Sequence, residues 1–173
     1  LPPDIRALEG WAAKDGFDSN RSAKRKTYCY SLYVAEREMP LKERFAVRID
    51  SAPAIEKLQA ASQLLEGEHD YKAFCASGSS VRTTIRTVYE VRVEETQSFG
   101  GRDIKMYVTG NGFLYNMVRI IAGTLMKVGN GSITPEEISR IIEGKDRTLA
   151  GPTAPAKGLT LVEIRYPNFK ICG

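Results

Sequence analysis

The sequence has few of the residues that bind metals or form disulfides. Its 173 residues include three cysteines that lie far apart, Cys29, Cys75 and Cys172, and a single histidine, His69. No spacing typical of a metal site or a disulfide framework occurs, so we expect neither. Sparse cysteines without such a framework favour a reducing, cytoplasmic compartment. A hydrolase built on His69, Asp70 and Cys75 is disfavoured, because a catalytic triad is defined by its arrangement in space and not by neighbours in sequence.

Long apolar runs and cofactor-binding loops are also lacking. The most apolar stretch surrounds Arg119 and is interrupted by that charge and by glycine, so we expect no membrane-spanning helix. The N-terminus, Leu1-Pro2-Pro3-Asp4, has no basic-then-apolar leader pattern, and because it does not begin with Met we expect a processed chain or a fragment. Gly110-Asn111-Gly112 lacks the full dinucleotide fingerprint and no P-loop is present, so we expect no cofactor.

Acidic residues are missing from two stretches that carry basic ones. Residues 19–35 and 73–89 contain no Asp or Glu, and the whole chain has a net charge of +4. Aromatic residues follow the first basic cluster at Tyr28, Tyr30 and Tyr33. Basic side chains beside exposed aromatics suit a nucleic-acid surface, although lysines that guard a solvated strand edge would give the same pattern. The candidate RNA-binding residues are Arg21, Lys24, Arg25, Lys26, Arg82 and Arg86.

The order of the expected elements predicts an α+β fold with a largely antiparallel sheet flanked by helices. Alternation predicts strands over residues 26–34, 87–94, 104–109 and 159–166, the middle two forming a hairpin. Helical patterns cover residues 51–66, the Arg119 region and a segment that stops at Gly144. The last strand is apolar on both faces, so we expect it to be central in the sheet.

Local signals predict where several elements begin and end. Ser51 is the expected N-cap of the first helix, and Gly67 ends that helix in a left-handed conformation. Asp70 is placed to cap a short helical turn. Thr134-Pro135-Glu136-Glu137 reads as a capping box that opens the last helix. Residues 1–21 and 36–48 carry no regular pattern and are expected to be irregular or connecting segments.

Arg119 is the most informative residue, because it is the only charge between Lys105 and Lys127. A guanidinium on a mostly buried helix is costly unless it meets an anion, either a carboxylate of the protein or a phosphate of a ligand. A structural carboxylate is the more common partner. Flanking glycines would let another group approach closely. The helix presents an apolar stripe, Leu114, Val118, Ile121, Leu125 and Val128, and a polar or small side, Gly112, Asn116, Arg119 and Gly123.

Six segments together resemble the TruA family of tRNA pseudouridine synthases. They are 1–5 (L-P-P-D-I), 26–30 (K-T-Y-C-Y), 67–74 (G-E-H-D-Y-K-A-F), 83–88 (T-T-I-R-T-V), 113–125 (F-L-Y-N-M-V-R-I-I-A-G-T-L) with Val128-Gly129, and 153–161 (T-A-P-A-K-G-L-T-L). The segments follow the family's order along essentially the whole chain, which makes the set specific although each segment alone is modest.

The resemblance implies a fold and a reaction. The fold is a pseudouridine synthase-like C-terminal domain in residues 36–173, preceded in residues 1–35 by the end of an N-terminal lobe and its crossing strand. The reaction isomerises uridines of the tRNA anticodon stem-loop to pseudouridine without metal or cofactor: an aspartate attacks, the glycosidic bond breaks, and uracil rejoins through C5. The implied partners are tRNA and a second copy in a homodimer. A non-catalytic RNA-binding domain of similar fold is the alternative.

The resemblance also implies roles for three residues. Arg119 matches the arginine that pairs with the catalytic aspartate, Tyr28 matches the tyrosine that stacks on the target uracil or transfers a proton, and Leu161 matches the apolar wall of the pocket. The family's catalytic aspartate lies upstream of the segment that matches residues 1–5, so no catalytic aspartate is expected in this chain, which would be inactive alone. The family's F-H-A-R segment reads Phe17-Asp18-Ser19-Asn20 here, with Arg21 one place later.

Overall fold

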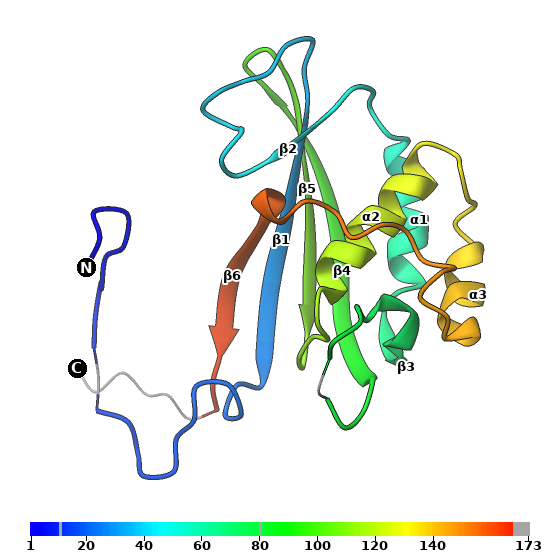
Figure 1. Ribbon diagram of the computed structural model, residues 1–173. Helices are drawn as coiled ribbons and strands as arrows, with labels where there is room; N and C mark the ends of the chain where they lie inside the picture. The colour runs from blue at the N-terminus through cyan, green and yellow to red at the C-terminus, as the bar shows by residue number, and fades with distance from the viewer. Residues whose placement is uncertain (11, 80, 168–173) are drawn as a thin grey trace.

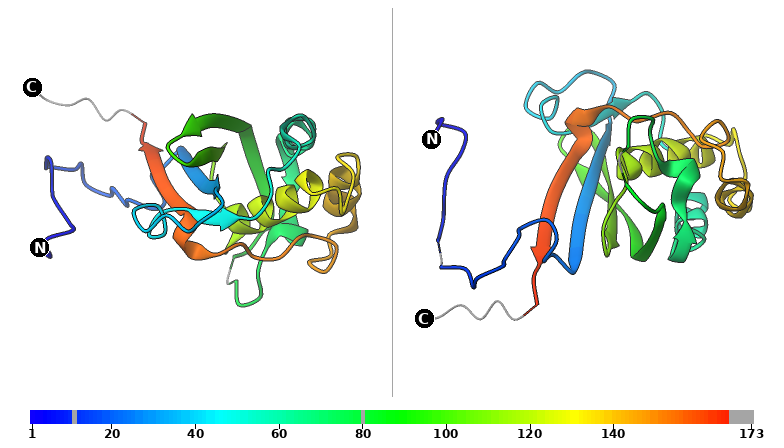
Figure 2. Two further views of the ribbon diagram at one scale, coloured as in Figure 1. Left: turned by 90° about the horizontal axis from the view of Figure 1, so that it is seen from above. Right: turned by 60° about the horizontal axis from the view of Figure 1, so that its bottom comes forward.

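The computed structural model describes residues 1–10, 12–79 and 81–167 (Figure 1). Within these ranges the strands are β1 Arg25–Val34, β2 Val47–Ile49, β3 Gly67–Asp70, β4 Ile85–Ser98, β5 Gly101–Gly110 and β6 Leu159–Arg165. The helices are α1 Ile55–Gln63, α2 Met117–Gly129 and α3 Glu137–Gly144, with short 3₁₀ turns η1 Tyr71–Phe74 and η2 Ala156–Gly158. The described residues before β1 form no helix or strand, as the sequence predicted. They lie on the side of the molecule away from the helices (Figures 1 and 2).

The six strands form one sheet in the order β2-β1-β5-β4-β3, and β6 pairs with β1 as well. Among the described strands the β1–β2 pair alone is parallel and the other pairs are antiparallel, which confirms the predicted α+β fold. The edge of β1 that faces away from β5 is shared: β2 pairs with residues 32–34, and β6 pairs with residues 25–30. β1 is therefore the strand that joins both β2 and β6 to the rest of the sheet.

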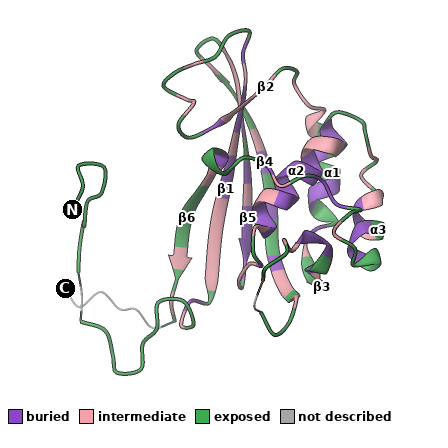
Figure 3. Ribbon diagram, viewed as in Figure 1, coloured by how far each residue is buried: buried purple, intermediate pink, exposed green. Residues whose placement is uncertain are grey.

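Helices cover one face of the sheet and enclose the hydrophobic core between the two layers (Figures 2 and 3). Alternate residues of β1, β4 and β5 point to this face, including Tyr30, Val91 and Met106. The predicted stripe of α2 packs against them, because Val118, Ile121, Leu125 and Val128 are all buried. Burying such apolar side chains contributes about 1.5–3 kcal/mol each. α2 is thus fixed in the centre of the core, where a polar side chain needs a hydrogen-bonding or charged partner.

Several local predictions are confirmed. β4 and β5 form the expected hairpin, paired from Ser98 and Gly101 at the turn down to Val88 and Gly110. The Asp70 carboxylate accepts a hydrogen bond from the Lys72 backbone N–H at 3.2 Å and so caps η1. β3 pairs antiparallel with β4, which places β3 and the following η1 beside the hairpin.

Other boundary predictions are wrong for identifiable reasons. The first helix begins after Ala54 and not at Ser51, because the Ala54 N–H bonds to the Gly129 carbonyl at the end of α2. Pro53 packs against Gly129 so closely that a Cβ there would lie 2.5 Å from the Pro53 side chain. The chain before α1 is therefore held extended against α2. β2 and β3 were missed because three or four residues are too few to show alternation.

The prediction that the last strand is central is also wrong. Among the described residues β6 pairs with β1 alone, so it lies at an edge of the sheet. Its apolar residues are partly open to solvent, since Leu161 is 45% exposed and Val162 is 52% exposed. Figure 3 shows most of β6 as exposed. An apolar edge strand places hydrophobic side chains where something else can contact them.

Candidate functional site

Two of the three predicted site residues lie opposite each other in the sheet. In the β1–β6 register Tyr28 is the direct partner of Leu161, and a register shift between Thr27 and Tyr28 marks a bulge at this point. The half-buried Tyr28 ring also meets Phe113 edge to face, with ring centroids 5.4 Å apart and an interplanar angle of 81°. Directly opposed side chains on one face of a sheet contact each other. Tyr28, Leu161 and Phe113 therefore form an apolar, aromatic wall.

Phe113 lies in the short segment between β5 and α2 and meets the Tyr28 ring from there. Gly110 makes room for it, since a Cβ at that position would lie 2.9 Å from the Thr87 carbonyl oxygen and 3.2 Å from the Phe113 ring. The sequence places Phe113 at the start of the family-like segment 113–125 but does not reveal its contact with Tyr28. The contact joins residues 85 positions apart through the strand register, and no local pattern encodes that register.

The Tyr28 hydroxyl differs from those of the neighbouring tyrosines. The Tyr30 hydroxyl donates to the Pro155 carbonyl at 2.8 Å, and the Tyr71 hydroxyl donates to the Leu65 carbonyl at 2.6 Å. Within the described parts of the chain, no hydrogen bond holds the Tyr28 hydroxyl. Buried tyrosines usually satisfy this group with a protein partner. Tyr28 thus offers a ring and a polar group to a ligand.

Arg119 is half-buried and is oriented by neutral acceptors. Its Nε donates to the Ala154 carbonyl at 2.6 Å, and its Nη1 donates to the Asn116 side-chain oxygen at 3.1 Å. No ion pair joins Arg119 to a carboxylate among the residues that the structure describes. The more common partner considered from sequence, a structural carboxylate, is therefore not found there. Fixed hydrogen bonds to neutral groups aim the guanidinium while leaving its full charge for an anion.

A segment that we call the strap, residues 151–155, sets the position of Arg119. It crosses α2 on its way from α3 to β6 (Figure 1). A Cβ at Gly123 would lie only 1.9 Å from the Pro152 carbonyl oxygen, so the strap can cross at this distance only above a glycine. The Gly151 N–H also donates to the Thr124 hydroxyl at 2.8 Å. The predicted close approach at Gly123 is confirmed, and the approaching group is the protein's own backbone.

Tyr30 connects Arg119 to the wall. Burial raises the pKa of the Tyr30 hydroxyl to about 12, and the nearby positive charge of Arg119 offsets part of that rise. Arg119 therefore lies within electrostatic reach of Tyr30, which follows Tyr28 by two residues on the same face of β1. The strand, the strap and α2 bring all three predicted site residues to one side of the sheet.

The six candidate RNA-binding residues fall into two groups, one at the start of β1 and one at the start of β4. Arg21 and Lys24 are exposed before β1, while the Arg25 guanidinium stacks over the Tyr89 ring at 4.9 Å from its centroid and Lys26 is half-buried. Arg82 is exposed in the loop before β4. Arg86 donates from Nη1 to the carbonyls of Thr83 and Ile85 at 2.9 and 2.6 Å.

Arg86 is the member of this set that reaches towards the wall. A Cβ at Gly112 would lie 4.0 Å from the Arg86 Nε, and Gly112 immediately precedes Phe113. RNA binding stays a prediction for all six residues, Arg86 included.

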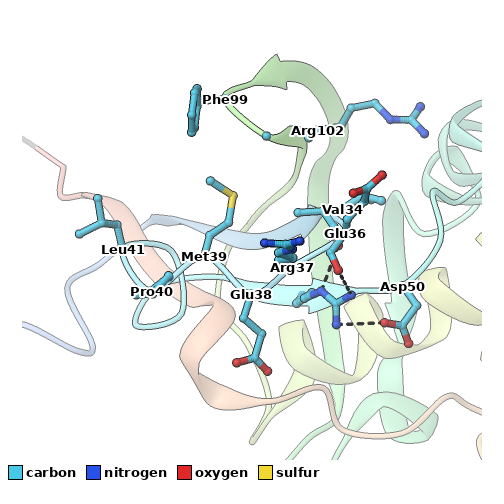
Figure 4. Close-up of a pocket in the computed structure, with 14 residues that line it drawn as sticks. Val34, Glu36, Arg37, Glu38, Met39, Pro40, Leu41, Asp50, Phe99 and Arg102 are labelled. Atoms are coloured by element: carbon cyan, nitrogen blue, oxygen red, sulfur yellow. Dashed lines mark hydrogen bonds and ion pairs between the residues drawn. The ribbon is translucent and has the colours of Figure 1, made fainter.

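A larger cavity lies elsewhere in the described part of the chain. It has a volume of about 900 Å³ and is lined by the end of β1, residues 36–41 and the β4–β5 turn (Figure 4). Its Arg48 guanidinium is held by the Ala35 and Glu36 carbonyls and by the Asp50 carboxylate. None of the wall residues lines this cavity, so it carries no part of the candidate site.

Two further structural findings concern the described residues alone. The described residues contain no group of three or more His, Cys, Asp or Glu side chains placed to hold a metal ion. No helix among them is long and apolar enough to cross a membrane.

Comparison with known proteins agrees with this arrangement. Residues 61–167 match a family model described as tRNA pseudouridine synthase. The chain belongs to the tRNA pseudouridine synthase family.

Its curated relatives carry a more specific name. The chain is 44% identical over 166 residues to tRNA pseudouridine synthase A of Thermoanaerobacter sp. (strain X514) and covers 66% of that protein. It is 42% identical over 168 residues to the protein of the same name from Bacillus licheniformis (strain ATCC 14580), and 40% identical to that of Bacillus subtilis (strain 168). About 96–97% of this chain and 66% of each relative is covered. The resemblance found in the sequence is thereby confirmed.

Proposed function

We propose that this chain supplies one side of the active site of an enzyme that isomerises uridine in tRNA to pseudouridine. The observation that carries the proposal is the half-buried Arg119 guanidinium, which is held by neutral oxygens with no carboxylate among the described residues, on the same side as the Tyr28–Leu161–Phe113 wall. A partly buried guanidinium held only by neutral oxygens is placed to pair with an anion. The anion is the catalytic aspartate of the complete enzyme.

The site residues divide the work of the reaction among them. Arg119 keeps the aspartate ionised and oriented, because an opposite charge nearby stabilises the carboxylate form. The Tyr28 ring stacks on the flipped uracil, and its hydroxyl lies ready for proton transfer. Leu161 and Phe113 exclude water from the base. The N1–C1′ bond breaks, uracil turns, the C5–C1′ bond forms, and the C5 hydrogen leaves as a proton while N1 gains one.

The nucleophile belongs to a segment that precedes residue 1 in the complete protein, so we propose that this chain alone is inactive. The targets are uridines in the anticodon stem-loop, and the basic residues around β1 and β4 hold the RNA backbone. The enzyme acts in the cytoplasm as a homodimer. Residues 1–35 end the N-terminal lobe, and residues 36–173 form the C-terminal domain.

Tritium release from tRNA labelled at uridine C5 tests the proposal directly. This chain and the complete protein are compared at equal concentration, with Arg119→Ala in the complete protein as a third sample. We expect release by the complete protein, none by this chain, and none by the variant.

Each other outcome would overturn a specific part of the proposal. Release by this chain alone would show that one of its own aspartates is the nucleophile. A fully active Arg119→Ala enzyme would remove the role of Arg119. Tight tRNA binding with no release from the complete protein would favour the non-catalytic RNA-binding domain.

A further inference from the structure

We infer that a second basic site, on the α3 side of the strap, holds a phosphate of the RNA backbone. This inference rests on the proposed function, because it concerns the same RNA substrate. The site is a cavity of about 290 Å³ that we call the strap pocket. Its lining includes Lys72, Ser77, Ser79, Thr84, Lys145 and Arg147. None of these residues belongs to the set predicted from sequence to bind RNA.

Arg147 repeats the arrangement of Arg119 on the other side of the strap. Its Nη1 donates to the Gly151 carbonyl at 2.8 Å, and its Nη2 donates to the Thr153 hydroxyl at 3.2 Å. It is half-buried, and no carboxylate pairs with it in the described part of the chain. The strap thus holds two guanidiniums through neutral oxygens, one at Ala154 and one at residues 151 and 153. Such a guanidinium retains its charge for an anionic ligand.

Two lysines complete the positive lining. Lys145 forms an ion pair with Asp70 at 3.0 Å, so part of its charge is already neutralised. Lys72 is exposed, and no ion pair holds it among the residues described. Asp146 lies near enough for the Lys72 charge to contribute to its lowered pKa, although bonds from Thr148 are the main cause. The described lining residues include no carboxylate, and Asp70 behind them offsets the charge of Lys145, so the uncompensated positive charges are those of Lys72 and Arg147.

The polar groups of the pocket suit a phosphate. Phosphate oxygens accept hydrogen bonds, and the lining offers hydroxyl donors from Ser77 and Ser79 beside the three cations, while the Thr84 hydroxyl donates to Asp70. Phosphodiesters carry one negative charge each, and proteins bind them with Arg, Lys, hydroxyls and backbone N–H groups. The cavity accommodates a phosphate together with part of its sugar.

The pocket lies next to the candidate active site along the chain of contacts. The Ala76 N–H donates to the Tyr115 carbonyl at 3.1 Å, which ties the loop of the pocket to the segment that leads into α2. Asn116 follows Tyr115 and orients Arg119. On the strap, Thr153 contacts Arg147 and its neighbour Ala154 contacts Arg119. The same strap and the same segment before α2 thus contact both sites, and we infer that an RNA strand bound at the wall continues over the strap pocket.

Salt-dependent binding of tRNA to the complete enzyme tests this inference. The variants are Lys72→Gln, Arg147→Gln and Arg147→Lys, and the control is Lys57→Gln, a neutralised lysine on the exposed side of α1. Loss of one phosphate contact lowers the slope of log affinity against log salt by about 0.7–0.9. We expect this change, with an affinity loss of about threefold or more at low salt, for Lys72→Gln and Arg147→Gln. Arg147→Lys should recover most of the slope, and Lys57→Gln should match the wild type.

The kinetic readout separates a phosphate contact from a structural role. A lost phosphate contact raises KM and leaves kcat nearly unchanged, whereas a loosened strap would displace Arg119 and lower kcat for both Arg147 variants. Wild-type slope and affinity in Lys72→Gln would overturn the inference, as would equal loss of kcat in Arg147→Gln and Arg147→Lys with an unchanged slope. An enzyme that forms no pseudouridine but shows the expected slopes would refute the proposed function alone.

Discussion

Replacing Gly123 by Ala tests whether the strap sets the geometry of the site. The new Cβ would lie 1.9 Å from the Pro152 carbonyl oxygen and 3.0 Å from its carbon, both of them backbone atoms. Ordinary contact begins near 3.4 Å, so the strap must move by about 1.5 Å. Overpacking of this kind costs about 3 kcal/mol, and the better helix propensity of Ala returns about 1 kcal/mol. The free energy of unfolding should fall by about 2 kcal/mol.

Thermal unfolding of the chain and pseudouridine formation by the complete enzyme measure the two consequences. A loss of 2 kcal/mol lowers the Tm of a domain of this size by roughly 4–8 °C. Activity should fall further than stability explains, because the displaced strap breaks the bond between Ala154 and Arg119.

Gly144→Ala is the matched control. It is also a helical glycine, but its Cβ would meet only the tip of the flexible Leu149 side chain. Its Tm should be unchanged or slightly raised. A Gly123→Ala protein with the Tm and activity of the wild type would refute the reasoning.

Three further substitutions probe single groups. Tyr28→Phe should leave the Tm within about 1 °C of the wild type, because no described residue bonds its hydroxyl, yet it should strongly lower the rate of tritium release; a large loss of Tm would contradict this. Ser62→Ala should raise the free energy of urea unfolding by about 1 kcal/mol, since the buried Ser62 hydroxyl has no partner among the residues described. The pKa of Asp70 lies below its ordinary value, mainly because of the Thr84 hydroxyl and then the Lys145 ammonium. Its carboxylate therefore stabilises the fold at neutral pH, and this contribution is lost as the pH falls below about 4. Asp70→Asn should cost about 1 kcal/mol at pH 7 and flatten the acid limb of stability against pH, and an unchanged acid limb would count against it.

The sequence predicted the parts of the fold that depend on local pattern. The strand around Tyr28, the β4–β5 hairpin and the apolar stripe of α2 all follow from periodicity within one segment. The family followed from six short motifs in the right order. Arg119 could be singled out because a lone charge in an apolar helix is visible without any structure.

Features that depend on distant contacts could not be predicted. The edge position of β6 was missed because apolar residues on both faces indicate burial only when both faces are covered. The orientation of Arg119 by Ala154, and its counterpart Arg147 on the same strap, depend on a backbone crossing at Gly123. A glycine in a helix indicates that another segment crosses closely, but it does not indicate which segment. The roles of Tyr28, Leu161 and the basic residues stay predictions until activity is measured.

The strap and α2 are joined by a reciprocal pair of bonds between the same two residues. The Arg119 side chain donates to the Ala154 carbonyl, and the Ala154 N–H donates to the Arg119 carbonyl at 3.2 Å. The Ala154 amide hydrogen can exchange with solvent deuterium only when the strap lifts from α2. Its exchange rate therefore measures how often the Arg119 guanidinium is released from the strap. A single backbone amide therefore reports, without any substrate, how often the strap separates from α2 and Arg119 loses its bond to Ala154.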